Sequence, residues 1–181
     1  MNNILSWLIW MPIIGMGIIA FIPRDKNDLI KIVAAVTTGL QFLLTVVLWQ
    51  NYDAGNGGMQ FMERAEWIPS FNISYILGVD GLSLPMVILT GLLCFIGIFV
   101  SWNINKAVKG YFALFLLLDT GIMGVFLSMD FFLFYIFWEV MLLPMYFLIG
   151  IWGGPQREYA AIKFFLYTLF GSVLMLIGIL G

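Results

Sequence analysis

The sequence predicts an all-α protein of six transmembrane helices, and three observations lead to this fold class. Hydrophobic residues make up 62% of the 181 residues and charged residues only 10%, with a mean hydropathy of +1.03, whereas about a quarter of a soluble domain is charged. Six apolar runs of spanning length follow one another, and basic residues gather in alternate connections. Too few polar groups remain to cover a water-facing surface, so lipid must surround most of the chain.

A spanning helix needs about 20 mostly apolar residues. The runs that meet this length predict helices at residues 4–22, 30–49, 83–101, 111–129, 131–152 and 160–180. The first run is too long for a signal peptide and lacks its basic start, so we expect it to be retained as a helix. Asp130 lies in a very short turn and is expected to cap the fifth helix.

The one long connection, residues 50–82, is expected to lie outside the membrane. Within it apolar and polar residues alternate, a period of two that predicts a short strand in a small hairpin. The alternating residues are Phe71, Asn72, Ile73, Ser74, Tyr75, Ile76 and Leu77. Ser83 can then cap the third helix, with Pro85 in its first turn.

Orientation follows from the basic residues, which favour the cytoplasmic side of a membrane. The odd connections and adjoining helix ends hold Arg24, Lys26, Lys31, Lys106, Lys109, Arg157 and Lys163, against Arg64 alone in the even connections. We therefore expect a multi-pass protein with its N-terminus outside, in the inner membrane of a bacterium. The sequence stops at Gly181, inside an apolar run. Either the sixth helix ends flush with the interface or, as we expect, the chain is the front part of a longer polypeptide.

Several kinds of site are not expected on this chain. No run of Lys and Arg could neutralise a nucleic-acid backbone. The chain has one cysteine, Cys94, and no histidine, so neither a disulfide nor a metal or cofactor site built on these ligands is predicted. Any redox chemistry should therefore take place on another chain.

Glu139 is the first candidate for a functional residue, because eight apolar or aromatic residues of its helix precede it. An acidic group at the centre of a spanning helix costs about 2.5–3.5 kcal/mol on insertion scales and is usually functional. Tyr135, one turn earlier, lies on the same face and could hydrogen-bond it. Pro144 leaves the carbonyl group of Val140 without its donor. We interpret Glu139 as a switchable proton site; a structural carboxylate bonded to another helix is the alternative.

Two further charged residues within predicted helices, Lys163 and Asp119, are candidates for a functional role. Lys163 could extend its ammonium group to the interface near Arg157, or point inward as a relay or pairing group. Asp119, as deep as Glu139, should face the helix bundle, bonded to Thr120 or to a neighbouring helix, in either a structural or a proton-transfer role.

Two stretches carry a resemblance to a known family. FLSMDFFLFYIFWEVMLLPMYFLIGIWGG from Phe126, followed by REYAAIKFFLYTLFGS, closely resembles the M-type membrane subunits of proton-pumping NADH:quinone oxidoreductase, respiratory complex I. YILGVDGLSLPMVILTG, around the start of the third helix, is similar to the same family. The more distant relatives are multi-subunit cation/proton antiporters and membrane-bound hydrogenases.

The resemblance implies a subunit of about fourteen helices in two inverted repeats, with this chain as its front part. It implies that Glu139 matches a glutamate that pairs with a lysine on a seventh helix, that Lys163 matches a family lysine, and that the acidic character at Asp119 occurs in some members. The implied role is proton translocation without a redox centre on this chain. NADH, FMN, iron–sulfur clusters and quinone would be bound by other subunits, and the antiporter-like L and N subunits would be neighbours.

Two other functions remain open from the sequence. One is a membrane subunit of a cation/proton antiporter or a membrane-bound hydrogenase. The other is a scaffold piece without a complete channel, since the seventh helix and its lysine lie beyond Gly181.

Overall fold

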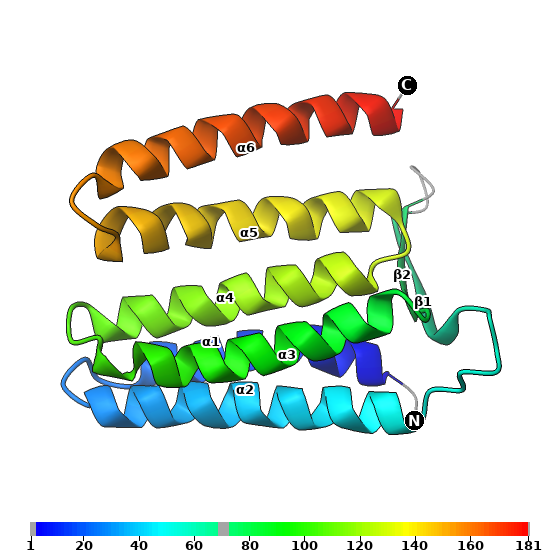
Figure 1. The fold of residues 1–181 in the computed structure, drawn as a ribbon, viewed down its shortest axis with the longest axis horizontal. Coiled ribbons are helices and arrows are strands. Elements are labelled where there is room, and N and C mark those ends of the chain that lie inside the picture. The colour runs from blue at the N-terminus through cyan, green and yellow to red at the C-terminus, as the bar shows by residue number, and fades with distance from the viewer. Residues whose placement is uncertain (1–2, 69–72, 181) are drawn as a thin grey trace.

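The computed structural model describes residues 3–68 and 73–180, and six helices in this part are long and apolar enough to cross a membrane. They lie side by side with alternating direction (Figure 1). The helices are α1 (Ile4–Phe21), α2 (Asn27–Gln50), α3 (Ser83–Val100), α4 (Val108–Leu127), α5 (Phe131–Trp152) and α6 (Arg157–Leu180). A 3₁₀ turn, η2 (Ser101–Asn103), follows α3, and the strands β1 (Gln60–Ile68) and β2 (Ile73–Val79) lie between α2 and α3.

Three helices differ from their expected ranges by two residues or more at one end or both. α2 and α6 each begin three residues before the expected start, at Asn27 and Arg157, because a helix continues into its polar first turn whereas hydropathy detects only the apolar part. α4 begins at Val108 and ends at Leu127 instead of residue 129. It ends early because the backbone leaves the helix to pair with β2, where the Met129 N–H group donates to the Ile76 carbonyl oxygen over 2.9 Å.

The helices α1 to α4 form a bundle in which α4 packs against the other three. Two apolar clusters fill its interior, one toward each end of the helices. The cluster near β1 and β2 includes Leu5, Leu8, Leu48, Leu77, Val87 and Met123. The other includes Ile19, Ile30, Ile98, Phe112 and Leu116. Because lipid tails are as apolar as these side chains, close packing within the bundle holds the helices together.

The α4–α5 contact depends on two glycines one turn apart. A Cβ atom at Gly121 would lie 2.5 Å from Met141 Cγ and 3.2 Å from the Phe137 carbonyl oxygen. A Cβ atom at Gly124 would overlap the ring of Phe137. Small residues at a helix–helix interface allow two membrane helices to approach closely in this way. The glycines therefore set the position of the middle of α5.

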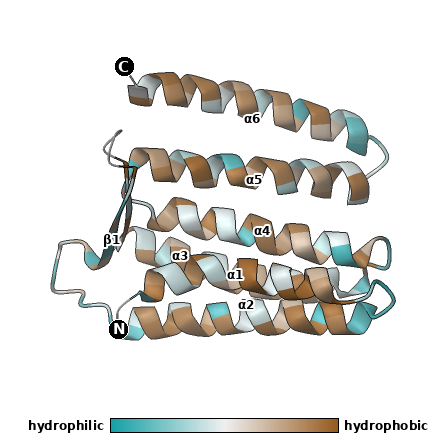
Figure 2. Ribbon diagram, turned by 180° about the vertical axis from the view of Figure 1, so that it is seen from behind, coloured by the Kyte–Doolittle hydropathy of each residue, from teal (hydrophilic) through white to brown (hydrophobic). Residues whose placement is uncertain are grey.

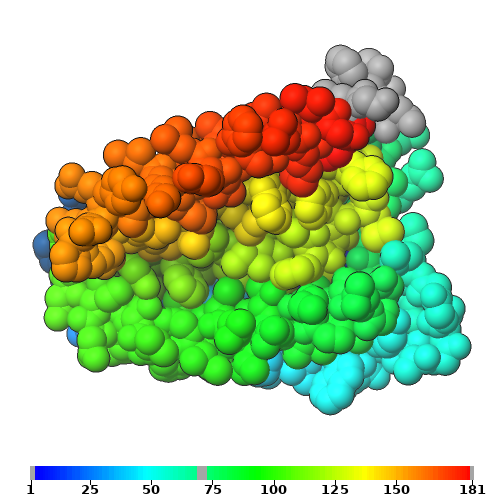
Figure 3. Space-filling view, turned by 45° about the horizontal axis from the view of Figure 1, so that its top comes forward, coloured from blue at the N-terminus to red at the C-terminus, as the bar shows by residue number. Residues whose placement is uncertain are grey.

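The outer helix α6 packs on α5 and on no other helix to a comparable extent. Only 6% of the residues in its most apolar segment are buried, compared with 44% of those in the corresponding segment of α4. Figure 3 shows α6 as an outlying ridge, orange to red, along this face of the molecule. Burial of the helices thus decreases from α4 through α5 to α6.

Polar segments gather at the helix ends, and Figure 2 shows a few hydrophilic bands within otherwise hydrophobic helices. At the end of the bundle that holds most basic residues, lysines donate to carbonyl oxygens at the C-terminal ends of neighbouring helices. These bonds are Lys31 Nζ to Trp102 O (2.7 Å), Lys109 Nζ to Ala20 O (2.8 Å) and Ile22 O (2.9 Å), and Lys106 Nζ to Ile151 O (3.4 Å). A cation is favoured at a helix C-terminus, where the last carbonyl groups lack intrahelical donors.

The predicted hairpin is present at the opposite end, as an antiparallel pair of β1 and β2. Phe71 and Asn72, part of the alternation that predicted it, lie outside the described residues. The predicted cap by Ser83 is wrong in its details. Asp80 Oδ1 accepts from the Ser83 N–H group at 2.6 Å, and Ser83 Oγ accepts from the Asp80 N–H group at 3.0 Å. Asp80 therefore caps α3 and Ser83 completes a reciprocal capping box.

Asp130 caps α5 as expected: its Oδ1 accepts from the N–H groups of Phe132 and Leu133, over 2.9 and 3.1 Å.

Candidate functional site

Glu139 lies in the ninth position of α5, and its carboxyl group is incompletely bonded. The residue as a whole is half-buried, but Oε1 is removed from solvent and has no hydrogen-bond partner among the described residues. A buried polar oxygen without a donor is costly, and native proteins usually provide a partner, a water molecule or a proton. The carboxyl group is therefore in a state that binding of a proton or of a cation would relieve.

The hydroxyl group of Tyr135 lies close to this carboxyl group, and that of Ser172 lies close to Tyr135. The Tyr135 hydroxyl group is placed next to both the Glu139 carboxyl group and the hydroxyl group of Ser172 on α6. Ser172 is buried and also donates to the Leu169 carbonyl oxygen over 2.9 Å. A tyrosine hydroxyl can donate and accept, so Tyr135 can connect the carboxyl group on α5 with α6.

A groove of about 490 Å³ reaches the carboxyl group from one side. Its walls are mainly apolar and include Leu117 of α4, Ile136 and Val140 of α5, and Leu176 of α6. Pro144, one turn beyond Val140, is buried, and α5 continues through it as a helix. Glu139 is thus a nearly solitary acidic group in an apolar, partly open setting, where a proton transfer would change the local charge strongly.

Lys163 is not brought to Glu139. It lies on the exposed face of α6, where its Nζ is 5.7 Å from the centre of the Tyr159 ring and 5.9 Å from that of the Tyr167 ring. Both rings are one turn away on the same helix, and such cation–π contacts are favourable. Within the part of the chain that the structure describes, Lys163 faces away from the bundle.

Asp119 is completely buried in α4 and belongs to a different group of residues. Its Oδ1 accepts from Gln41 Nε2 of α2 over 3.3 Å. The predicted bond to Thr120 is absent, because the Thr120 hydroxyl group donates to the Leu116 carbonyl oxygen over 3.1 Å. The predicted bond to a neighbouring helix is present instead. The structure therefore separates the two mid-helix carboxyl groups into different environments.

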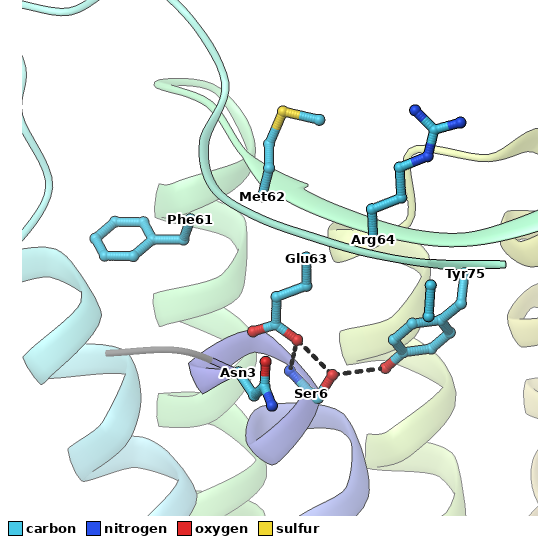
Figure 4. A pocket seen from close by; sticks show the side chains of 8 residues that line it. Asn3, Ser6, Phe61, Met62, Glu63, Arg64 and Tyr75 are labelled. Atoms are coloured by element: carbon cyan, nitrogen blue, oxygen red, sulfur yellow. Dashed lines mark hydrogen bonds between the residues drawn. The ribbon is translucent and has the colours of Figure 1, made fainter.

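A third acidic residue, Glu63 of β1, was missed by the sequence analysis. Its oxygens accept from the N–H groups of Leu5 (2.8 Å) and Ser6 (3.1 Å) and from the Ser6 hydroxyl group. Figure 4 shows Glu63 reaching from the strand to the start of α1, with the Tyr75 hydroxyl group next to Ser6. Glu63 therefore caps α1 from another element, and no local sequence signal reveals such a cap.

Comparisons with known proteins agree with this architecture. Residues 128–181 match a family model described as "NADH:quinone oxidoreductase/Mrp antiporter, TM". The chain is 42% identical over its whole length to NADH-quinone oxidoreductase subunit M of Rhodobacter capsulatus. It is 42% identical, over 97% of its length, to NADH-ubiquinone oxidoreductase chain 4 of Arabidopsis thaliana. In both alignments it spans 36% of the relative's length.

Among solved structures, a chain of respiratory complex I from Thermus thermophilus with bound NADH superposes with a TM-score of 0.83. The identity is 26%, and the match covers 97% of this chain and 35% of that one. The six-helix arrangement, the family model and the full-length similarity thus agree. The chain spans about a third of the length of these relatives. It belongs to the family of NADH-quinone oxidoreductase subunit M and chain 4 proteins.

Proposed function

We propose that this chain is part of a proton-translocating membrane subunit of an NADH:quinone oxidoreductase, and that Glu139 binds the transferred proton. The observation that carries this proposal is that Glu139 lines an apolar groove and that its buried Oε1 has no hydrogen-bond partner among the described residues. An acidic group in an apolar spanning helix is costly and usually functional, and an oxygen without a donor is free to accept a proton or a hydrogen bond. A small change in the position of a cation or a hydroxyl group would therefore shift the proton on or off.

The chemistry needs only reversible proton binding. The carboxylate takes up one proton and becomes neutral, and it releases that proton when a nearby positive charge stabilises the carboxylate. The Tyr135 hydroxyl group lies between Glu139 and Ser172 and can form a hydrogen bond with each of them. The lysine that the family resemblance pairs with this glutamate lies outside the present chain. No redox step is assigned to this chain; NADH, FMN, iron–sulfur clusters and quinone are proposed to act on other subunits.

The same proposal gives the setting of the protein. It would lie in the inner membrane of a bacterium with its N-terminus outside, next to the antiporter-like L and N subunits. The distribution of basic residues supports this orientation, because the lysine-rich ends of α2 and α4 lie together with the C-terminal ends of α1 and α5. Lys163, exposed on α6, would be available to a segment of the full-length subunit that packs against this helix.

The test is Glu139→Gln in the full-length subunit within its native assembly. We expect proton translocation, and the NADH-to-quinone electron transfer coupled to it, to fall about tenfold or more, since the amide cannot bind and release the proton. Glu158→Gln is the matched control, because Glu158 is an exposed glutamate in the first turn of α6. Near-normal translocation by Glu139→Gln in an intact assembly would refute the role of Glu139.

A second function, cation/proton antiport, is favoured by the description of the matched family model, which includes the Mrp antiporter. Vesicles that contain the assembly separate the two functions. Proton movement driven by NADH oxidation supports the first function, whereas proton movement driven by an imposed sodium gradient, without NADH, supports the second.

A further inference from the structure

The Asp119–Gln41 contact shows an unusual pattern of satisfied and unsatisfied atoms. Gln41 and Asp119 are both completely buried. Gln41 Nε2 donates to Asp119 Oδ1 over 3.3 Å and to the Leu8 carbonyl oxygen of α1 over 3.1 Å. Gln41 Oε1 and Asp119 Oδ2 have no hydrogen-bond partner among the described residues. Two neighbouring side chains therefore each keep one acceptor oxygen without a donor.

The orientation of the Gln41 amide group is fixed by its partners. Both atoms that Nε2 contacts are oxygens that accept hydrogen bonds, one on a carbonyl group and one on a carboxyl group. A reversed amide would bring Oε1 against these two acceptors and lose both bonds. The missing donor cannot therefore be supplied by turning the amide group. Of the two side chains, only the carboxyl group can then supply a donor to Gln41 Oε1, by binding a proton.

Within the part of the chain that the structure describes, the groups around Asp119 offer no positive charge. α1 contributes the Leu8 carbonyl group through Gln41, α2 contributes Gln41, and α3 contributes the thiol group of Cys94, which lies beside the carboxyl group. Lys31 is ten residues before Gln41, and its ammonium group donates to the Trp102 carbonyl oxygen instead. On α5, Glu139 lines a separate groove. An ionised carboxylate would therefore be buried without a cation, which is strongly unfavourable.

We propose that Asp119 binds a proton and remains a neutral carboxylic acid, and that it forms with Gln41 an acid–amide pair that fastens α4 to α2 and, through Leu8, to α1. One proton on Oδ2 gives the carboxyl group a donor for Gln41 Oε1, the acceptor that otherwise has no partner among the described residues. The pair then has a donor and an acceptor on each side chain, as a buried polar network requires. The deep acid Asp119 is a permanent proton site that does not exchange its proton during transport.

This inference deepens the proposed function in one respect, since it assigns different roles to two carboxyl groups at similar depth in the membrane. It rests on the proposed function only where it says that Glu139, and not Asp119, exchanges the proton. The protonation of Asp119 itself depends on the Gln41 contact and on burial alone. The two proposals can therefore fail separately.

The first experiment measures the proton directly, by infrared spectroscopy of the purified native assembly. We expect Asp119→Asn to remove one band from the carbonyl-stretch region of protonated carboxylic acids, with the wild-type band constant between about pH 6 and about pH 9. Asp28→Asn, at an exposed aspartate in the first turn of α2, is the control that should remove no band. A spectrum unchanged by Asp119→Asn would overturn the proposal.

The second experiment tests the pair and its role in function. Asp119→Asn should keep assembly and NADH-driven proton translocation within about twofold of wild type, because the amide is neutral and similar in shape. Asp119→Leu should lower the assembled subunit several-fold, because Gln41 loses its partner, and adding Gln41→Leu should restore much of that loss.

Translocation lost by Asp119→Asn in an intact assembly would show that Asp119 exchanges protons, and would overturn the proposal. Failure of the double variant to recover any assembly would overturn the pairing with Gln41. Because neither the infrared band nor the assembly measurement depends on Glu139, a normal Glu139→Gln variant would refute the proposed function and leave the proton on Asp119 and its pairing with Gln41 standing.

Discussion

The α1–α4 bundle and the α5–α6 pair provide opposite environments for a carboxyl group within a spanning helix. In the bundle, Asp119 is fully enclosed and contacts an amide group on another helix. In the outer pair, Glu139 is half-buried, and its unbonded oxygen lies at an apolar groove. Both residues are near the middle of a spanning helix. Depth in the membrane alone therefore does not determine the environment of an acidic side chain. The number of helices that enclose it, and the hydrogen-bond partner that they supply, determine that environment.

The difference follows from how many neighbours each helix has. α4 contacts four other helices, whereas α6 has one extensive neighbour. Enclosure on all sides favours a fixed, neutral acid, because an uncompensated charge would have no solvent. A helix with one open side can let a charge appear and disappear as its surroundings change. The proton-transfer chemistry is thus proposed for the less enclosed region of this chain.

The seam between the two regions offers the strongest test of the comparison. Gly124→Ala should destabilise the packing of α5 on α4 by about 1–3 kcal/mol, because the added Cβ overlaps the Phe137 ring and overpacking forces a shift. The thermal unfolding temperature of the assembly measures this effect. Gly17→Ala on α1 is the matched control, since nothing lies within 4 Å of its Cβ position. An equal loss from both variants would show that the seam is not specially close-packed.

A smaller effect is expected at the hairpin end of the bundle. Glu63→Ala removes the acceptor of the Leu5 and Ser6 N–H groups, which should cost about 0.5–2 kcal/mol, as for loss of other helix caps. Limited proteolysis of the hairpin, together with thermal unfolding, would detect the loosening. Glu66→Ala, at an exposed glutamate on the same strand, should leave both measurements unchanged. Wild-type protease resistance of Glu63→Ala would show that the hairpin is held by other contacts.

The smallest effect concerns Asp80, an acidic residue outside the spanning segments. Hydrogen bonds from the backbone and side chain of Ser83 hold the pKa of Asp80 below its ordinary value of 3.8. Since the folded pKa is below the unfolded one, the carboxylate stabilises the fold above about pH 3.8, and this contribution disappears as the pH falls through the folded pKa.

The matching variant is Asp80→Asn, which should flatten the decrease of the unfolding temperature between about pH 5 and about pH 3 and cost under about 1 kcal/mol at neutral pH. A pH dependence identical to wild type would show that other groups cause the decrease. If the prediction holds, the chain contains three kinds of acidic residue. Asp80 is charged outside the spanning segments, Glu139 is proposed to exchange a proton, and Asp119 is proposed to remain neutral.

Much of the fold was predictable because it depends on composition over about twenty residues. Hydropathy identified all six helices, and the alternation before Ser83 indicated the hairpin. The boundaries of α2, α4 and α6 were less accurate, since polar first turns and the pairing of Met129 with Ile76 carry no hydropathy signal. Local pattern therefore gave the elements but not their ends.

The site was only partly predictable, because its partners are distant in sequence. Glu139 and Asp119 were recognisable as charges in apolar helices, and Tyr135 followed from helical spacing. Gln41, 78 residues from Asp119, and Glu63, 58 residues from Leu5, contact their partners only after the helices have packed. A single sequence holds no record of such contacts. Which carboxyl group is enclosed and which lies at a groove therefore required the structure.

The lysines at the ends of the helices have a consequence for how this protein can change during evolution. The lysines that predict the orientation of the chain are the same residues whose ammonium groups donate to carbonyl oxygens at the ends of α1, η2 and α5. A substitution that removed one of them would weaken the insertion signal and a tertiary contact at once. A basic residue in these connections can therefore be replaced during evolution only by one at a position from which it still reaches an exposed helix end. The same substitutions thus affect both the orientation of the chain and its folding.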